Sequence, residues 1–343
     1  MTSRVARASV ALIAVLAVLA VTGCSSGSVS TPPASVSLGT AEAPTAIAPT
    51  TAPTSFVVEA GRIAYGVKGA DGSVHVASAN ADGSNIHQLT TGSGFQACVT
   101  YSPDRTRIAY CSDASGNFEI WTVGSDGSNQ AQVTHLGGSA LFPNYSPDGK
   151  LIAFGGGQIN VVDATTGASL QVLTNCTGQK PGCSNDFPAW SPDGMKILYI
   201  HAEDSNANGE PVNSQIWIMD ADGSHAKALT SDPASKDQLP EWSPDGLQIA
   251  YERGNGGNGG IWLMDADGSH DHQLTGCTAT DPSPCAVGDD FGPAWSPDGT
   301  EIAFVRDFGA LGQNDRPVYV MNADGTNQHR VIADPIVQYV PAW

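Results

Sequence analysis

The fold is decided by the stretch Trp242-Ser-Pro-Asp-Gly246, which continues through Ile249-Ala-Tyr251, Ile261-Trp-Leu-Met264 and Ala266-Asp-Gly268. The first motif predicts a tight turn, because proline presets φ, aspartate bonds nearby backbone and glycine accepts a positive φ. The β-branched and aromatic runs that follow predict short strands, and Asp-Gly predicts a hairpin turn between two of them. With a last short strand ending in Leu-Thr, one such unit contains about four strands.

This unit recurs along the chain. Its first turn stands at Tyr101–Asp104, Tyr145–Gly149, Trp190–Gly194, Trp242–Gly246 and Trp295–Gly299. A unit that lacks this turn begins at Phe56, and the spacing between unit starts is close to 45 residues or slightly longer. A period of about 45 residues with four strands per unit is typical of a β-propeller. Residues 56–343 are therefore predicted to form one all-β, six-bladed propeller with four-stranded antiparallel blades.

The last residues, Val340-Pro-Ala-Trp343, repeat the opening of a unit. We expect this strand to pair into the first blade, where the opening motif is missing. Such pairing joins the two ends of the ring and removes an open sheet edge.

The repeats resemble the PD40 repeats of TolB-like six-bladed propellers, which are related in form to WD40 repeats. The resemblance covers residues 56–343. It implies an extracytoplasmic propeller that binds protein partners. TolB itself carries an additional α/β domain before its propeller, where this chain has a polar linker.

The N-terminus has the pattern of an export signal. Arg4 and Arg7 precede an apolar run over residues 8–21, which is short for a membrane span and typical of a signal peptide. The following Val21-Thr-Gly-Cys24 resembles the lipobox of bacterial lipoproteins. The resemblance implies a signal peptide over residues 1–23 and acylation, as with palmitate, of Cys24. An ordinary signal peptide that contains a cysteine is the alternative.

Residues 24–55 are rich in Ser, Thr, Pro and Ala, and Glu42 carries their one charge. Such a segment has too little apolar surface to offset the entropy of ordering. We therefore expect a lipid-anchored linker between the membrane and the propeller. The predicted protein is an exported cell-envelope lipoprotein, held to the membrane by its lipid and facing the periplasm or the cell wall.

The overall charge disfavours two classes of partner, nucleic acids and anionic lipid surfaces. The 343 residues include 15 Lys+Arg and 34 Asp+Glu, which gives a net charge of −19. Nucleic-acid binding and docking on anionic lipid both need clustered basic residues. We therefore expect no nucleic-acid partner and no membrane contact besides the N-terminal lipid.

The two ends of the predicted propeller differ. If each unit contains strands a, b, c and d, the a–b and c–d turns share one face, and the b–c and d–a loops share the other. The first, which we call the turn face, repeats Ser-Pro-Asp-Gly and Asp-Gly turns. The second, the loop face, holds the longer segments at residues 175–186, 201–214, 252–260, 276–292 and 306–317.

Six cysteines besides Cys24 fall on the loop face. Their economical pairing is into three local disulfides, which an exported protein permits: Cys98–Cys111, Cys176–Cys183 and Cys277–Cys285. Metal binding by these cysteines is the alternative, and the absence of Cys-x-x-Cys disfavours it. Rigid loops on a scaffold are where binding sites usually lie.

A candidate ligand site follows from the residues just before each strand a. Large apolar residues stand there: Phe95, Phe142, Phe187, Leu239, Phe291 and Tyr339. Acids lie near several of them: Asp186, Asp237, Asp289 and Asp290. If strand a is innermost, these residues ring the mouth of the central channel. The alternative is that the apolar residues are core between blades and the acids cap turns.

One segment suggests a metal. Asp204-Ser-Asn-Ala-Asn208-Gly209 matches the first half of a calcium-binding loop, with Asp204, Asn206 and Asn208 as ligands. A plain polar hairpin loop is the alternative, and the sequence suggests no other cofactor. No His-Glu-x-x-His, P-loop or dinucleotide fingerprint is present.

The sequence therefore favours a monomeric, non-catalytic binding or scaffold module. Its partner would be a protein or a cell-envelope ligand on the disulfide-braced loop face. An alternative is a metal-dependent hydrolase of the lactonase or esterase type with its site in the central channel. A third possibility is a structural envelope protein without a small ligand.

Overall fold

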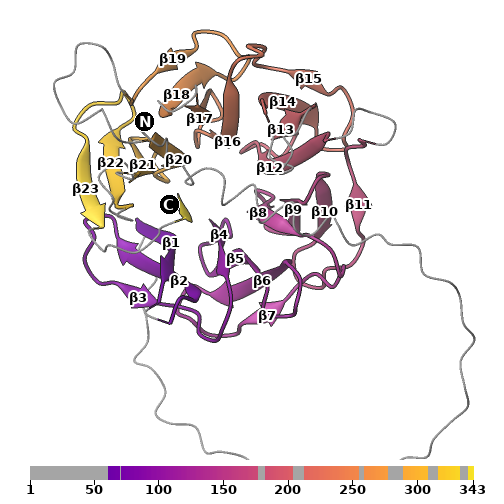
Figure 1. Cartoon of the computed structure of the whole chain (residues 1–343), viewed down its shortest axis with the longest axis vertical. Helices are drawn as coiled ribbons and strands as arrows, with labels where there is room; N and C mark the ends of the chain where they lie inside the picture. The colour runs from indigo at the N-terminus through magenta and orange to yellow at the C-terminus, as the bar shows by residue number, and fades with distance from the viewer. Residues whose placement is uncertain are drawn as a thin grey trace, which may run out of the picture.

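The computed structural model describes residues 61–69, 71–176, 182–203, 212–254, 259–276, 289–307, 316–332 and 339–343. The described residues form 24 strands in six four-stranded antiparallel sheets, which surround a central axis as blades (Figure 1). The predicted all-β six-bladed propeller is confirmed. The proposed signal peptide, Cys24 and the linker lie outside the described residues. No helix in the described ranges is long and apolar enough to cross a membrane.

The blades follow one another along the chain, and only the first also uses the C-terminal strand. The first two blades contain β24 (Tyr339–Ala342), β1 (Arg62–Lys68), β2 (Val74–Asn80), β3 (His87–Gln88), and β4 (Gln96–Tyr101), β5 (Arg107–Ser112), β6 (Glu119–Gly124), β7 (Ala131–Gln132). The third and fourth contain β8 (Leu141–Tyr145), β9 (Leu151–Gly155), β10 (Asn160–Asp163), β11 (Gln171–Val172), and β12 (Ser184–Trp190), β13 (Lys196–Ala202), β14 (Gln215–Asp220), β15 (Lys227–Ala228). The fifth and sixth contain β16 (Lys236–Trp242), β17 (Gln248–Gly254), β18 (Gly260–Asp265), β19 (His272–Gln273), and β20 (Asp289–Trp295), β21 (Glu301–Asp307), β22 (Val318–Asn322), β23 (His329–Ile332).

The Ser-Pro-Asp-Gly turns are held by their own side chains. Ser243 Oγ donates to Asp245 Oδ1 at 2.6 Å, and the same oxygen accepts the Leu247 amide at 3.0 Å. Gly246 has a φ of 71°, which glycine adopts without strain. These hydrogen bonds hold the pKa of Asp245 below its usual value. The same serine–aspartate bond recurs in the turns at Asp104, Asp148, Asp193 and Asp298.

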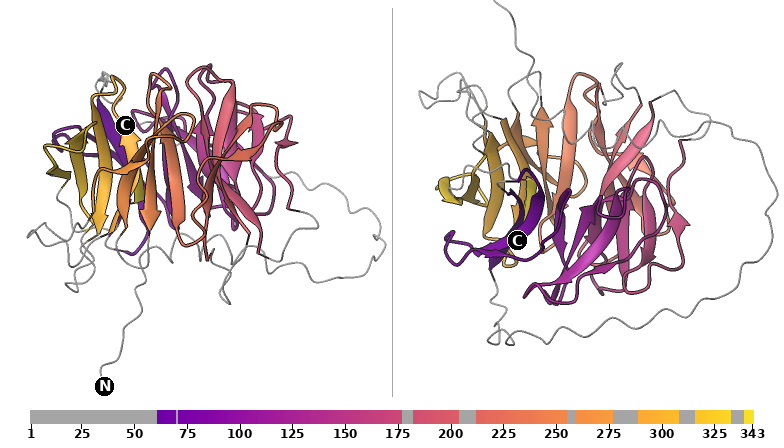
Figure 2. Two further views of the ribbon diagram at one scale, coloured as in Figure 1. Left: turned by 90° about the horizontal axis from the view of Figure 1, so that it is seen from above. Right: turned by 60° about the horizontal axis from the view of Figure 1, so that its bottom comes forward.

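The first strand of each unit is innermost, which is the arrangement that the candidate site at the channel mouth requires. The strands β4, β8, β12, β16, β20 and β24 contact one another in sequence and form a closed inner ring. All strands run between the two faces of the disc, so the loops gather at its two ends (Figure 2). The outer strands β3, β7, β11, β15 and β19 have two residues each, which leaves little unpaired sheet edge.

The hydrophobic core lies between neighbouring blades. Ile200, Ile216 and Tyr251 belong to the cluster that joins the fourth blade to the fifth, and each is buried. Five equivalent clusters occupy the other junctions between blades. Each blade therefore buries one face against each neighbour, and its packing is complete only within the ring.

The C-terminal strand closes this ring. In β24, Ala342 pairs with Ala64 of β1, and Tyr339 pairs with Gly66. Trp343 packs against the cluster between the sixth and first blades, and Ala342 packs against the cluster between the first and second. The strand that we expected to join the first blade thus contributes to the core on both sides of it.

Removal of residues 339–343 exposes the edge of β1 and opens two core clusters. We expect the melting temperature to fall by about 10 °C or more, since each kcal/mol is worth about 2–4 °C in a domain of this size. Calorimetry of the truncated and full chains measures the difference. The variant Trp343→Ala separates the indole from strand pairing, and an unchanged melting temperature in the truncated chain contradicts closure by β24.

Candidate binding site at the loop face and central channel

Each innermost strand of blades two to six carries a β-bulge where it passes the channel. The pairing register shifts between Ala97 and Thr100 in β4, and at equivalent places in β8, β12, β16 and β20. The first bulge residue has a φ between 52° and 65°: Cys98, Phe142, Phe187, Leu239 and Gly292. Four of these five are not glycine, so their backbone conformation is strained.

The second bulge residue is proline in four of these strands: Pro143, Pro188, Pro240 and Pro293. Val99 stands at this place in β4. Proline has no N–H to donate, and a bulge leaves one residue out of the hydrogen-bond ladder. The Pro-x-Trp pattern of the repeat is therefore the sequence signal of the bulge.

The inner ring encloses a cavity of about 100 Å³, lined by residues of all six innermost strands. At its loop-face end lie the bulge residues Cys98, Phe142, Phe187 and Leu239, together with Val340. The rings of Phe142 and Phe187 stack with their centroids 3.8 Å apart. Two residues farther along the strands, toward the turn face, the wall is formed by Thr100, Asn144, Ala189, Glu241 and Ala342.

The structure brings together only some of the apolar residues predicted at the channel mouth. Phe142, Phe187 and Leu239 line the cavity. Phe95 instead packs edge-on against Phe118, with 5.6 Å between ring centroids, and Phe291 is buried between the sixth and first blades. The side chain of Tyr339 lies outside the described residues. These residues stand at different distances before the serine of the Ser-Pro-Asp motif in their units. Because the bulge changes the side to which the following residues point, residues at different distances face different sides of the strand.

Asp237 does not line the cavity but forms a buried ion pair. Its carboxylate accepts hydrogen bonds from Arg253 Nε at 2.7 Å and Arg253 Nη2 at 3.1 Å. The third guanidinium nitrogen donates to Asp271 at 2.6 Å, and the guanidinium lies over the ring of Trp262 at 4.4 Å. Asp237 is fully buried, so this pair fixes the loop-face ends of β16 and β17.

Asp290 repeats this arrangement in the next blade. Arg306 donates to its two carboxylate oxygens at 2.7 and 2.8 Å and lies over the ring of Tyr319 at 4.7 Å. The arginine stands directly opposite the aspartate on the neighbouring strand, as Arg253 stands opposite Asp237. The side chain of Asp289 lies outside the described residues.

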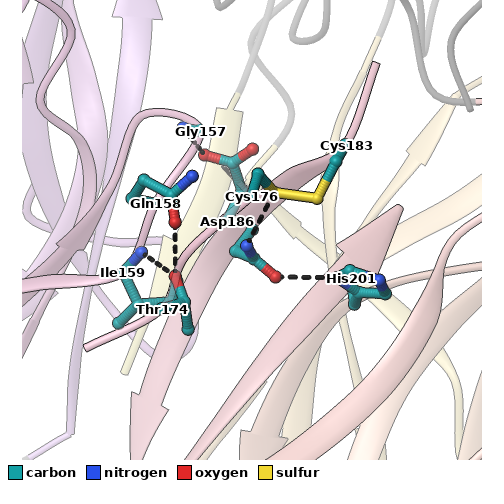
Figure 3. The surroundings of a disulfide bond; sticks show 9 residues. Gly157, Gln158, Ile159, Thr174, Cys176, Cys183, Asp186 and His201 are labelled. Carbon is teal, nitrogen blue, oxygen red and sulfur yellow. Dashed lines mark hydrogen bonds between the residues drawn. A yellow bond between two sulfur atoms is a disulfide. The ribbon is translucent and has the colours of Figure 1, made fainter. Parts of the chain in front are cut away.

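Asp186 is buried without a cation. Its Oδ1 accepts the backbone amides of Gly156 at 2.7 Å and Gly157 at 3.1 Å, both from the preceding blade. Figure 3 shows the bond to Gly157. Burial raises the pKa of Asp186 to about 6, because desolvation outweighs these hydrogen bonds. We expected Asp186, Asp237 and Asp290 to bind a ligand at the channel mouth. The structure uses their carboxylates to fix the loop face, and none of the three lines the cavity.

The position held by the ion pairs carries a neutral pair in the fourth blade. Asn185 Oδ1 lies 2.8 Å from His201 Nδ1, and Asn185 Nδ2 donates to Cys176 Sγ at 3.2 Å (Figure 3). The imidazole lies 4.9 Å from the ring of Trp217, and burial lowers the pKa of His201. The disulfide loop is thereby tied to β12 and β13.

Two of the three predicted disulfides are present. Cys98 pairs with Cys111 and Cys176 with Cys183, with Cα atoms 5.5 and 5.7 Å apart. The first ties the bulge of β4 at the cavity to β5. These bonds indicate an extracytoplasmic protein. Cys277 and Cys285 lie outside the described residues.

The proposed calcium ligands Asp204, Asn206 and Asn208 also lie outside the described residues. Within the ranges that the structure describes, no group of three or more His, Cys, Asp or Glu side chains could hold a metal ion.

Sequence reasoning missed the three polar residues of the cavity. Three units read Pro-Ala-Trp at this place, ending at Trp190, Trp295 and Trp343. The other three read Val-Thr-Tyr, Pro-Asn-Tyr and Pro-Glu-Trp, so Thr100, Asn144 and Glu241 replace alanine. Aligning the units on the repeat serine would have revealed this departure.

Glu241 is the one acid among the described residues that line the cavity. Its carboxyl group accepts a hydrogen bond from the Trp295 amide of the next blade, and burial raises its pKa to about 8. Asn144 Oδ1 accepts the Trp190 amide at 2.9 Å in the same way. Each of these side chains thus links neighbouring blades at the cavity wall.

The two kinds of buried aspartate should respond differently to amide substitution. Asp237→Asn removes the buried carboxylate that binds two of the three guanidinium nitrogens of Arg253, and we expect the free energy of unfolding to fall by about 3–5 kcal/mol. Asp186→Asn keeps an oxygen acceptor for both glycine amides and removes a desolvated charge. We expect its free energy of unfolding near pH 8 to be no lower than that of wild type. Chemical denaturation of both variants measures this free energy. Equal losses in the two variants contradict the assignment.

The buried carboxyl of Glu241 makes stability depend on pH. Its folded pKa of about 8 exceeds its unfolded value, so its contribution to stability is present at low pH. That contribution is lost as the pH rises from about 4.5 to 8. The glutamine in Glu241→Gln cannot ionise. The melting temperature of this variant should therefore rise relative to that of wild type as the pH increases across this interval. Glu301→Gln on the turn face is the control, and parallel pH profiles for wild type and Glu241→Gln contradict the assignment.

Comparison with known proteins agrees with this architecture. The model of the TolB β-propeller domain, PD40, matches residues 44–212. No curated protein sequence matches the chain significantly. The structure is similar to TolB from Acinetobacter baumannii, with a TM-score of 0.65 and 22% identity over 82% of this chain and 66% of that one. The chain thus spans slightly less than two thirds of that TolB.

Two further structures share the fold. A putative TolB from Agrobacterium tumefaciens has a TM-score of 0.59 and 21% identity, over 79% of this chain and 88% of that one. A chain of a nidogen/laminin complex has a TM-score of 0.62 and 11% identity, over 82% of this chain and 97% of that one. The repeat and the six closed blades thus give the chain a TolB-like β-propeller fold, and the PD40 model matches its residues 44–212.

Proposed function

We propose that the protein is an extracytoplasmic, non-catalytic binding module whose loop face holds a protein or a cell-envelope ligand. The observation that carries this proposal is the difference between the two faces. The loop face is fixed by two disulfides and by the buried carboxylates of Asp186, Asp237 and Asp290, whereas the turn face repeats one local turn. A rigid face loses little entropy when it binds a partner.

Apolar groups on this face support a macromolecular partner. Leu136 follows β7 and Val212 precedes β14, both at the loop face, and they are 44% and 61% exposed. Phe142, Phe187 and Leu239 at the cavity are half-buried. Apolar and aromatic side chains held on a rigid surface are typical anchors of protein interfaces.

The entry point of the chain fits this orientation. Arg62 begins β1 at the turn face, since β1 is the second strand of its blade. A linker over residues 24–55 with a lipid on Cys24 would therefore join the propeller at the turn face. The proposed monomer would then present its loop face away from the membrane.

Charge substitutions on matched exposed residues test the proposal. Leu136→Asp with Val212→Asp places two charges on the loop face. Met195→Asp with Leu247→Asp does the same on the turn face, where both residues are 66% exposed. We expect the loop-face variant to lose at least about tenfold in capture of its crosslinked envelope partner, as for loss of anchor contacts.

The turn-face variant should capture as wild type does, and both should keep the wild-type melting temperature. Quantitative crosslinking in envelope extracts, followed by mass spectrometry, measures the capture. Equal capture by wild type and the loop-face variant refutes the placement. A loss confined to the turn-face variant assigns the partner to the other end of the propeller.

A further inference from the structure

The three polar residues of the cavity depart from a repeat that otherwise demands alanine. Ala189 and Ala294 are buried at this place, and the fold accepts them in the fourth and sixth blades. Folding therefore does not require a polar side chain here. Departures from the pattern of a repeat gather at functional sites, and Thr100, Asn144 and Glu241 all line one cavity.

The hydrogen bonds between blades leave defined atoms for a ligand. Asn144 Oδ1 is held by the Trp190 amide, so its Nδ2 is the group left to donate into the cavity. One carboxyl oxygen of Glu241 is held by the Trp295 amide in the same way. Among the described residues, nothing bonds Asn144 Nδ2, the second Glu241 oxygen or the Thr100 hydroxyl.

These groups lie on opposite sides of the channel. Thr100 and Asn144 stand on β4 and β8, in neighbouring blades, whereas Glu241 stands on β16, three blades from β4 in a ring of six. The wall beside them is apolar, with Phe187 and Pro240 among its members. A ligand between the two sides meets an amide donor, a hydroxyl and a carboxyl group within an apolar sleeve.

We propose that the central channel binds a small neutral carboxamide, held between Glu241 on one side and Thr100 and Asn144 on the other. The amide oxygen accepts from Asn144 Nδ2, and the amide nitrogen donates to Glu241 and to the Thr100 hydroxyl. A short apolar tail contacts the proline and phenylalanine wall. The cavity of about 100 Å³ suits a ligand of a few heavy atoms.

Other ligand classes fit these groups less well. A calcium ion needs about 6–8 oxygen ligands, but Glu241 is the one carboxylate of the wall and Asn144 presents its nitrogen. A carboxylate finds no basic side chain among the lining residues. A primary ammonium group can donate to Glu241 and to the Thr100 hydroxyl, but on the other side it meets a donor, Asn144 Nδ2. Of the classes compared, a carboxamide matches the donor and the acceptors together.

Ligand-observed NMR with propionamide tests the proposal on the purified protein at a pH above the Glu241 pKa of about 8, where the carboxylate is ionised and accepts. Propionamide has few heavy atoms, so we expect a dissociation constant in about the millimolar range. Propionate, propylammonium and butanone have similar size but lack one part of the match. Each should bind at least about tenfold more weakly, as for loss of one or two buried hydrogen bonds.

The variant with Thr100→Ala, Asn144→Ala and Glu241→Ala reproduces the alanine of the other three blades, so it should fold. It should lose at least about tenfold in propionamide affinity, while Leu247→Ser on the turn face loses nothing. Glu241→Gln keeps its oxygen on the Trp295 amide and presents an NH2 donor to the cavity, so it should also lose propionamide affinity.

Three results overturn the proposal: no propionamide binding to wild type, equal affinity in the triple-alanine variant, or tighter binding of propylammonium or propionate than of propionamide. The two proposals share the apolar residues at the channel mouth, but their variants change different residues, since Leu136 and Val212 do not line the cavity. The capture test on the loop-face variant and the propionamide test on the alanine variant can therefore give different outcomes, so one proposal can fail while the other holds.

Discussion

The structure depends on the pairing of β24 with β1. Each blade buries its faces against its neighbours, so a single open junction exposes apolar surface on two blades at once. Residues 339–343 close that junction, and they do so from the far end of the chain. The cavity depends on the same closure, because Val340, Pro341 and Ala342 form part of its wall. Stability and binding site therefore rest on one short strand.

The parts of the fold that could be predicted are those set by local contacts. The hydrogen bond between Ser243 and Asp245 spans two residues, so the Ser-Pro-Asp-Gly motif is enough to predict the turn. The number of times the motif recurs predicts the number of blades. The disulfides span 13 and 7 residues, but a cysteine in this sequence has few possible partners, so Cys98–Cys111 and Cys176–Cys183 could be predicted. A buried acid has many possible partners, and Arg253 lies 16 residues after Asp237. Only the strand register shows that the two side chains meet.

The bulge explains the remaining differences at the candidate site. An extra residue in a strand shifts the alternation of its side chains, so proximity to strand a does not say which way a residue points. Phe142 and Phe187 fall on the bulge and reach the cavity, whereas Phe291 falls one position earlier and enters the core. Counting back from the repeat serine recovers this distinction and also reveals Asn144 and Glu241. The charge of Asp186, Asp237 and Asp290 made them candidates for ligand binding. In the structure, arginines neutralise Asp237 and Asp290, and burial desolvates Asp186.

The prolines of the inner ring and the brevity of the outer strands limit how this protein can recognise another chain. Peptides often bind sheet proteins by adding a strand, which needs a run of unpaired N–H and C=O groups along an exposed edge. Here five of the six innermost strands contribute a proline to the channel wall, and five outer strands offer only two residues each. Among the described strands, only β23 offers an outer edge of four residues, and the outer edges of the other five blades are poor templates for an added strand. Recognition at those blades therefore depends on side chains, and a sequence change at a single loop or channel position can alter the partner without disturbing a blade.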